Sequence, residues 1–163
     1  MNLSPLRAAN VNKRDDGFTL IELLVVVVII GVLVAIAVPV YLNYRKGAAD
    51  KSAQSDVRGA VSAVEQFYTD NGNNYPKSDT ATNDGTATGA ASITLAPVSG
   101  TAATTQVITL SDKTQLSYVN SGSGGYLICA TSSGGSGKWY LYNSTLGGSV
   151  SASATTLSPT TCS

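Results

Sequence analysis

The most prominent pattern in the sequence is a long apolar run near its beginning. From Leu23 to Leu42 the chain carries no charged residue. The segment 18–42 is long enough to cross the roughly 30 Å hydrocarbon core of a bilayer as a helix. Gly31 and Pro39 fall inside this run, and a proline removes one backbone donor and crowds the carbonyl four residues back. We therefore predict a membrane-compatible helix over 18–42 that bends at Gly31 and Pro39.

A second helical pattern follows, in which apolar residues recur at steps of three and four. These apolar residues are Val57, Ala60, Val61, Val64, Phe67 and Tyr68. Polar residues fill the opposite positions, so the pattern predicts an amphipathic helix with one buried face. Asp70-Asn71-Gly72 is a strong stop signal. We expect one continuous helix over 18–70, in which the amphipathic continuation occupies 43–71 together with its cap.

Beyond the turn at Gly72–Pro76 the pattern changes from helices to strands. Short runs of β-branched and aromatic residues are separated by turns rich in Gly, Ser and Asn. The candidate strands are Ser92–Leu95, Gln106–Leu110, Gln115–Val119, Tyr126–Ala130 and Lys138–Tyr142. The predicted fold class is α+β, with a long N-terminal helix packed on a small antiparallel sheet in residues 72–163. The tail over 144–163 is expected to be irregular.

The amino-acid composition excludes several classes of function. The 163 residues include 10 Lys or Arg, 10 Asp or Glu and no His. The absence of His removes the commonest general base, the commonest transition-metal ligand and every Ser-His or Cys-His pair. Balanced charge gives no field that would attract nucleic acid. We predict a non-enzymatic protein with no cofactor, no metal and no specific nucleic-acid site.

The two cysteines fall in a segment that is rich in hydroxyl groups and poor in charge. Residues 78–163 contain only five charged residues among many Ser and Thr, which suits a domain exposed outside the cell; they are Asp79, Asp84, Asp112, Lys113 and Lys138. Cys129 and Cys162 are wrongly spaced for zinc. In an exported domain they predict a disulfide, whereas in a reducing compartment they would be two unrelated thiols.

One charge interrupts the start of the apolar run. In the stretch Gly17-Phe18-Thr19-Leu20-Ile21-Glu22 the carboxylate of Glu22 lies where an unpaired ionised group costs several kcal/mol. Residues 1–17 ahead of it are polar, contain the pair Lys13-Arg14 and have no helical or strand periodicity. They are interpreted as a leader peptide.

This order of features resembles the type IV pilin family, including its pseudopilin relatives. The resemblance rests on the Lys13-Arg14 pair, on Gly17 to Glu22 and on Pro39, and it implies a type IV pilin-like fold. It implies that a prepilin peptidase cuts between Gly17 and Phe18, leaving Phe18 as an N-methylated N-terminus. It also implies that Thr19 and Glu22 serve assembly, with Glu22 neutralising the terminal amine of a neighbouring subunit.

The leader departs from the family pattern at Asp15-Asp16, where many family leaders are more basic. The combination is similar to prepilins of Gram-positive bacteria, particularly actinobacteria.

The function that the resemblance implies is structural. The chain would be a subunit of an extracellular type IV pilus that supports adhesion, motility or DNA uptake. Its partners would be further copies in a helical homopolymer, the prepilin peptidase and N-methyltransferase, and the assembly platform with its ATPase. It would begin as a single-pass membrane precursor with a cytoplasmic N-terminus and end in the filament. The alternative is a pseudopilin that acts as a piston in a type II-like secretion system.

Three other readings of the apolar run stay open. Glu22 could mark a proton or ion path through the membrane. Ala35-Ile36-Ala37 has the form of a leader-peptidase site, which would leave a soluble chain beginning at Val38. The run could also be a plain anchor that never polymerises. Charge does not set the orientation by itself, because Lys13-Arg14 precede the run and Arg45-Lys46 follow it.

Overall fold

The computed structural model describes residues 17–86, 91–100, 103–153 and 155–163. The chain divides into two compact units, Met1–Pro39 and Val40–Ser163. Of the predicted leader, only Gly17 falls within the described residues. The predicted boundary between the apolar run and the rest of the chain, at residue 42, is thus close to a division in the structure.

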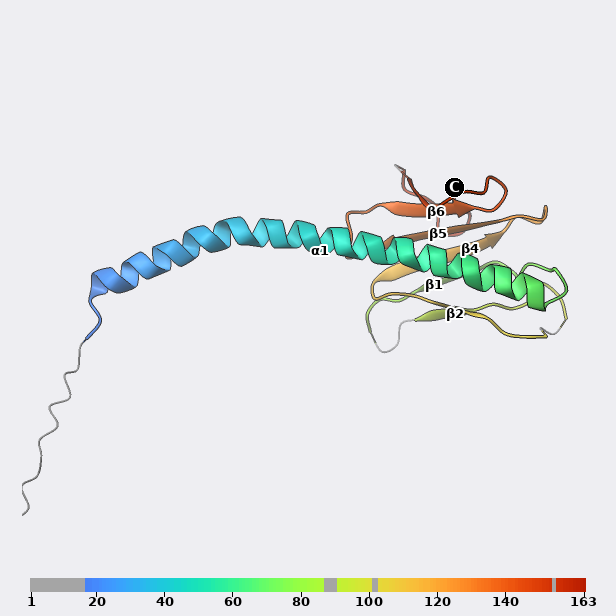
Figure 1. The fold of residues 1–163 in the computed structure, drawn as a ribbon, viewed down its shortest axis with the longest axis horizontal. Coiled ribbons are helices and arrows are strands. Elements are labelled where there is room, and N and C mark those ends of the chain that lie inside the picture. Colours follow the sequence, from blue (N-terminus) through green and yellow to red (C-terminus); the bar gives the residue numbers. More distant parts are fainter. Residues whose placement is uncertain (1–16, 87–90, 101–102, 154) are drawn as a thin grey trace, which may run out of the picture. The chain divides into compact units, whose positions relative to one another are not determined.

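The only helix among the described residues is α1, which spans Leu20–Asp70 over 51 residues (Figure 1). It begins two residues later than the apolar pattern suggests and ends at the predicted stop signal. Every residue of the first unit from Gly17 to Pro39 is exposed. By length and composition α1 is able to cross a membrane. Gly31 and Pro39 lie inside the helix, and the bend at these two residues stays a prediction.

The part of α1 that belongs to the second unit buries one face, as the stripe of apolar residues predicts. Its fully buried apolar residues follow the helical period and are Ala53, Val57, Ala60, Val64 and Phe67. Val61 and Tyr68, at the margins of the predicted stripe, are only half-buried. This face forms one hydrophobic cluster with side chains of the sheet.

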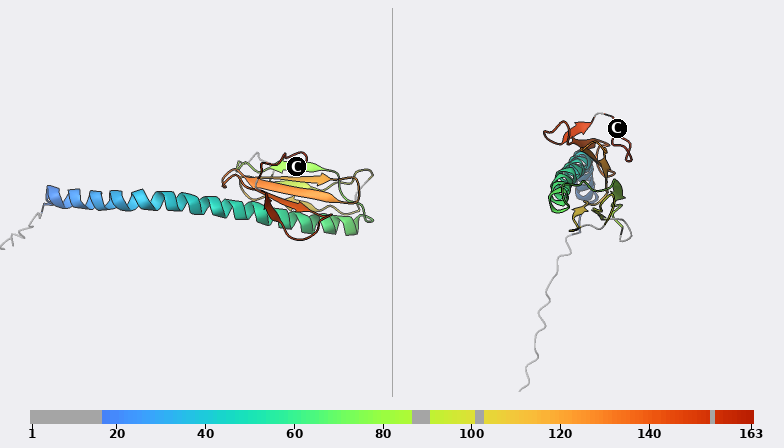
Figure 2. Two further views of the ribbon diagram at one scale, coloured as in Figure 1. Left: turned by 90° about the horizontal axis from the view of Figure 1, so that it is seen from above. Right: turned by 90° about the vertical axis from the view of Figure 1, so that its right-hand side faces the viewer.

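The sheet of the second unit is antiparallel and has five strands in the order β1-β4-β5-β6-β7. Figure 2 shows it beside the later part of α1. The strands are β1 (Asp79–Thr82), β4 (Thr114–Asn120), β5 (Tyr126–Ser132), β6 (Trp139–Asn143) and β7 (Ser151–Ser153). A separate two-stranded sheet is made by β2 (Ser92–Thr94) and β3 (Val107–Thr109). The predicted α+β class is confirmed, but the strands divide into two sheets instead of one.

Two strands are missing from the prediction, and the tail was wrongly expected to be irregular throughout. The first, β1, has the sequence Asp-Thr-Ala-Thr, and the second, β7, has Ser-Ala-Ser. Apart from the two threonines of β1, neither has the β-branched or aromatic side chains that mark a strand in a sequence. Both lie at the edges of the sheet and pair through their backbones, β1 with β4 and β7 with β6. Their existence therefore depends on the partner strand and not on local pattern.

Alternation along the central strands gives the sheet two buried faces. On the face toward α1 lie Leu116, Tyr118, Tyr126, Ile128, Ala130 and Tyr140. On the opposite face Cys129 and Trp139 form a second cluster with Leu157 and Cys162 of the tail. The helix thus covers one face and the C-terminal tail covers the other.

Candidate functional site

The segment around the predicted cleavage point begins in an open stretch before α1. Among the described residues, nothing lies within 4 Å of where a side chain on Gly17 would lie, and the side chain of Phe18 is 81% exposed. Residues 17–19 precede the helix and adopt no regular structure. The peptide bond between Gly17 and Phe18 therefore joins two exposed residues outside regular secondary structure.

Thr19 and Glu22 form a capping box at the start of α1. The backbone N–H and the hydroxyl of Thr19 donate to Glu22 Oε2 at 2.9 and 2.7 Å. The backbone N–H of Glu22 donates to Thr19 Oγ1 at 3.3 Å. These reciprocal bonds satisfy donors that the first turn of a helix leaves free. The spacing Thr-x-x-Glu is a known sequence signal for this motif, and it was not used in predicting the elements from the sequence.

The predicted disulfide between Cys129 and Cys162 is present. Cys129 lies in the central strand β5, on the face that the tail covers. Cys162 adopts a positive φ of 54° and its N–H bonds to the carbonyl of Ser158, so the tail turns sharply at the bridge. The disulfide holds the tail against the sheet and closes a loop over residues 129–162.

Carboxylates on α1 fasten the loops of the sheet to the helix. Asp50, which is buried, accepts hydrogen bonds from the backbone N–H and the hydroxyl of Ser136. Asp56 accepts both bonds from Ser111 at 2.8 Å each. Near the end of the helix Asp70 accepts bonds from Thr104 and Gln106. These contacts were not predicted, because the helical period shows which face is polar but not which loop meets it.

The hydrogen bonds at Asp70 also change its acidity. The side chain of Gln66 donates to the carboxylate at 2.9 Å. This bond is the main cause that lowers the pKa of Asp70, and the bonds from Thr104 and Gln106 act in the same direction. The carboxylate is thus held in its charged form at the end of α1.

A group of tyrosines packs between the end of α1 and the sheet. Ring centroids of Tyr68 and Tyr75 are 4.4 Å apart, and those of Tyr75 and Tyr126 are 5.1 Å apart. The hydroxyl of Tyr126 donates to Glu65 Oε1 at 2.7 Å. Burial first, and then the hydrogen bond and charge of Glu65, raise the pKa of Tyr126 well above its usual range. The group supports the contact between helix and sheet.

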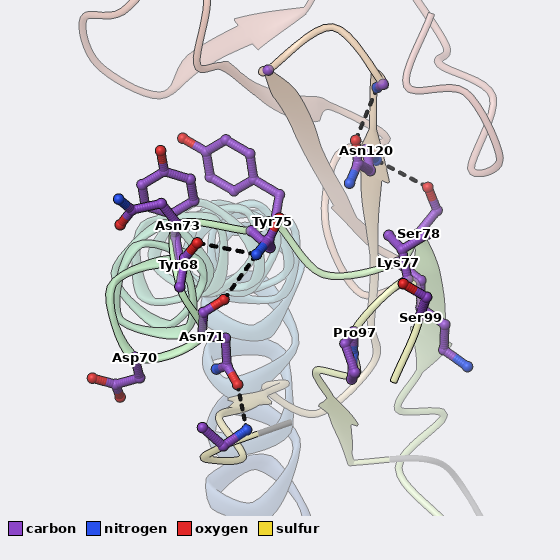
Figure 3. Close-up of a pocket in the computed structure, with 16 residues that line it drawn as sticks. Tyr68, Asp70, Asn71, Asn73, Tyr75, Lys77, Ser78, Pro97, Ser99 and Asn120 are labelled. Carbon is purple, nitrogen blue, oxygen red and sulfur yellow. Dashed lines mark hydrogen bonds between the residues drawn. The ribbon is translucent and has the colours of Figure 1, made fainter. Parts of the chain in front are cut away.

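A hollow of about 900 Å³ lies between the end of α1 and the loops beyond it (Figure 3). Asn71 Oδ1 accepts from the N–H of Ala103 at 2.7 Å. Asn120 Nδ2 donates to the carbonyl of Pro76 at 2.8 Å, and its Oδ1 accepts from Gly122. These two amides thus tie together loops that form the walls of the hollow. Among the described residues, no group of three or more His, Cys, Asp or Glu is placed to hold a metal ion.

These features define a class of protein. The helix α1 starts as an exposed apolar segment and continues as the support of an antiparallel sheet, and the tail after that sheet is bridged to it by a disulfide. This is the arrangement of a pilin-like protein. No solved structure gives a significant match to the chain.

Part of the chain is similar to known proteins. Residues 12–38 match the model of the prokaryotic N-terminal methylation motif. The chain is 35% identical over 65 residues to the type IV major pilin PilA of Myxococcus xanthus, a match covering 40% of this chain and 30% of that protein. It is 40% identical over 70 residues to the type IV major pilin PilE of Neisseria gonorrhoeae, covering 43% and 41%. It is 36% identical over 67 residues to core protein G of the type II secretion system of Aeromonas hydrophila, covering 41% and 46%.

The chain therefore carries the N-terminal methylation motif and is similar, over the matched segment, to type IV major pilins and to a core protein of the type II secretion system. The matched segments span less than half the length of the relatives named here. They do not test the predicted relation to Gram-positive prepilins.

Proposed function

We propose that the chain is the precursor of a subunit of a type IV pilus. The observation that carries the proposal is the position of Gly17, Phe18 and Glu22 at the start of an exposed apolar helix. In this proposal a prepilin peptidase removes residues 1–17 by cutting between Gly17 and Phe18, and Phe18 is then N-methylated. The family match over residues 12–38 supports this processing.

Before assembly, the segment 18–42 holds the subunit in the membrane. Its side chains are exposed throughout, which suits contact with lipid first and with other subunits afterwards. The hydroxyl-rich domain with its disulfide is placed outside, since disulfides persist in oxidising surroundings. The N-terminus is then cytoplasmic, and the subunit leaves the membrane through the assembly platform and its ATPase.

Glu22 gives the assembled filament its register. In a correctly placed subunit the carboxylate lies beside the amine of Phe18 from a neighbour, and the two charges neutralise each other. A misplaced subunit leaves the carboxylate buried without a partner, at a cost of several kcal/mol. Residues 18–42 form the filament core in this arrangement, residues 43–71 the support, and residues 72–163 the outer domain.

A second candidate function is that of a pseudopilin, which forms a short piston in a secretion system. The sequence identity to core protein G, 36%, is about equal to the 35% identity to the pilin PilA. The tail bridged by Cys129–Cys162 and the hydroxyl-rich surface favour a filament exposed outside the cell.

Mass spectrometry of filaments sheared from the cell surface tests the proposal. A pilus subunit yields an N-terminal peptide that begins with methylated Phe18. A peptide that begins at Val38, or surface preparations without the protein, contradict it. Deletion of the gene then distinguishes the two functions. Loss of long surface filaments indicates a pilus. Retention of a normally exported protein inside the cell envelope indicates a pseudopilin.

A further inference from the structure

A basic hollow lies where α1 leaves the apolar run. Its volume is about 420 Å³, and three cations line it: Arg45 and Lys46 from α1, and Lys113 from the turn between β3 and β4. All three belong to the second unit. Lys113 lies far from the other two in sequence, so the fold and not local composition brings this positive charge together.

The side chain of Lys113 packs beside α1. Its Cδ lies 3.6 Å from the point that a Cβ would occupy on Gly134, and the Cβ of Ala49 lies 3.6 Å from the same point. Ala49 follows Arg45 and Lys46 by one helical turn, so it lies on their side of the helix. The apolar stem of Lys113 therefore runs along the same side of α1 from which Arg45 and Lys46 line the hollow.

The backbone at Lys113 is in a conformation that favours glycine. Its φ is 61°, in a turn that is closed by a bond from the N–H of Thr114 to the carbonyl of Ser111. Asp56 on α1 fixes this turn through its two bonds to Ser111. A lysine held in a strained turn, at a place where glycine would fit without strain, is a sign that its side chain has a function.

One acidic residue lines the basic hollow, and two others lie near it on α1. Asp112 lines the hollow, but its carboxylate packs against the backbone of Gly85 in the loop after β1. Asp50 and Asp56 on α1 accept hydrogen bonds from Ser136 and Ser111. Three cations and one carboxylate, that of Asp112, line the hollow itself, so its lining carries an excess of positive charge.

The helix residues that line the hollow follow directly after the predicted membrane span, where the headgroup layer would lie. Tyr41 and Tyr44, at the end of the apolar run, are 60% and 77% exposed. The guanidinium of Arg45 lies 5.8 Å from the centre of the Tyr41 ring. Exposed tyrosines followed by cations mark the headgroup layer at the end of a membrane span. Leu42, the last residue of that span, itself lines the hollow.

We propose that the basic hollow binds the phosphate of an anionic phospholipid headgroup while the subunit is still in the membrane. The proposal rests on the proposed function, in which the segment 18–42 spans the membrane before assembly. Arg45 and Lys46 contact the headgroup layer from the helix, and Lys113 contacts it from the sheet domain. The lipid therefore fixes the domain at the membrane surface until the subunit is extracted.

The test uses the full chain in nanodiscs of phosphatidylcholine, with and without phosphatidylglycerol. Native mass spectrometry counts the lipids that each protein retains. The chain is expected to retain phosphatidylglycerol in preference to phosphatidylcholine. Lys113→Gln is expected to lower this retention about fivefold, because one cation near an anionic membrane surface contributes about that factor to binding. Lys113→Arg keeps the retention, and Lys138→Gln, at an exposed lysine of the same domain, leaves it unchanged.

The remaining outcomes contradict the proposal, and each identifies the part of it that fails. A chain that inserts but shows no preference for phosphatidylglycerol lacks the lipid site and keeps its anchor. A chain that does not insert contradicts the anchor and the lipid site together. Displacement of the lipid by millimolar inorganic phosphate would assign the hollow to a free anion. If Lys113→Gln fails to form the Cys129–Cys162 disulfide, Lys46→Gln takes its place, and unchanged retention in that variant refutes the site.

Discussion

Glu22 Oε2 accepts two hydrogen bonds from Thr19, one from its backbone N–H at 2.9 Å and one from its hydroxyl at 2.7 Å. The carboxylate that we propose for contact between subunits is therefore already paired within its own chain. A subunit in the membrane does not have to expose a bare charge to hydrocarbon near the helix start. Assembly would replace hydrogen bonds from Thr19 by an amine from a neighbour, which costs less than removing a hydrated charge from water.

This relationship predicts the effect of changes at Thr19. Thr19→Ser keeps the hydroxyl and should leave the capping box intact. Thr19→Val removes it at nearly constant volume and should loosen the first turn of α1 by about 1 kcal/mol. Hydrogen exchange of the backbone amides of residues 19–23, measured on the full chain in detergent micelles, should then be several-fold faster for Thr19→Val only. Equal exchange in both variants would show that the hydroxyl does not cap the helix.

The disulfide should decide whether the tail stays on the sheet. In the entropy model, closing a loop over residues 129–162 contributes about 3.8 kcal/mol to the free energy of unfolding. Cys162→Ala should lose much of this and free the tail from the face that carries Trp139. Since the chain contains one tryptophan, which is only 7% exposed, its fluorescence reports on this face alone.

The expected result is a shift of the Trp139 emission to longer wavelength, together with a lower unfolding midpoint. Leu157→Ala serves as a partner variant, because it removes an apolar contact with the same cluster while the bridge stays. An unshifted emission spectrum in Cys162→Ala would show that the tail covers this face without the disulfide.

Much of the fold follows from patterns that are local in the sequence. The stop signal at Asp70 and the buried stripe of α1 are confirmed, because the helical period and the caps act over a few residues. The central strands β4, β5 and β6 are confirmed for the same reason, since their large side chains alternate between two covered faces. At Thr19 and Glu22 the spacing alone would have given the capping box.

What sequence reasoning missed depends on contacts between distant parts of the chain. The edge strands β1 and β7 have small side chains and exist because β4 and β6 offer free backbone groups. The hydrogen bonds that Asp50 accepts from Ser136 join residues 86 positions apart. The position of Lys113 beside α1 likewise requires the turn that Asp56 holds. None of these can be read from a periodic pattern.

The bonds that Asp50 makes to the loop between β5 and β6 should matter for stability. Asp50→Ala leaves the N–H and hydroxyl of Ser136 without their charged acceptor, and we expect a loss of about 2 to 3 kcal/mol in the free energy of unfolding. Asp79→Ala is the matched control, since the carboxylate of Asp79 is exposed and accepts a bond from its own neighbour Thr80. Denaturant unfolding followed by circular dichroism gives both values. Equal losses in the two variants would contradict a specific role for Asp50.

The buried tyrosines should make the second unit sensitive to alkali. Burial is the main cause that raises the pKa of Tyr126 and of Tyr118 above their usual range, and the charge of Glu65 adds to it. A group whose pKa is higher in the folded protein stabilises that state fully below its unfolded pKa. That stability is lost as the pH rises toward the folded pKa. Stability should therefore fall above about pH 10, where tyrosine ionises in an unfolded chain.

Tyr126→Phe tests this dependence directly. The variant loses the hydrogen bond to Glu65 and should be less stable at neutral pH by about 1 kcal/mol. It also loses one group that ionises on unfolding, so its free energy of unfolding should fall less steeply above pH 10 than that of the unchanged chain. The measurement is denaturant unfolding at a series of pH values, with Tyr142→Phe as the control on the neighbouring strand β6. Parallel pH profiles for Tyr126→Phe and the unchanged chain would show that Tyr126 ionises in the folded domain as readily as in the unfolded chain.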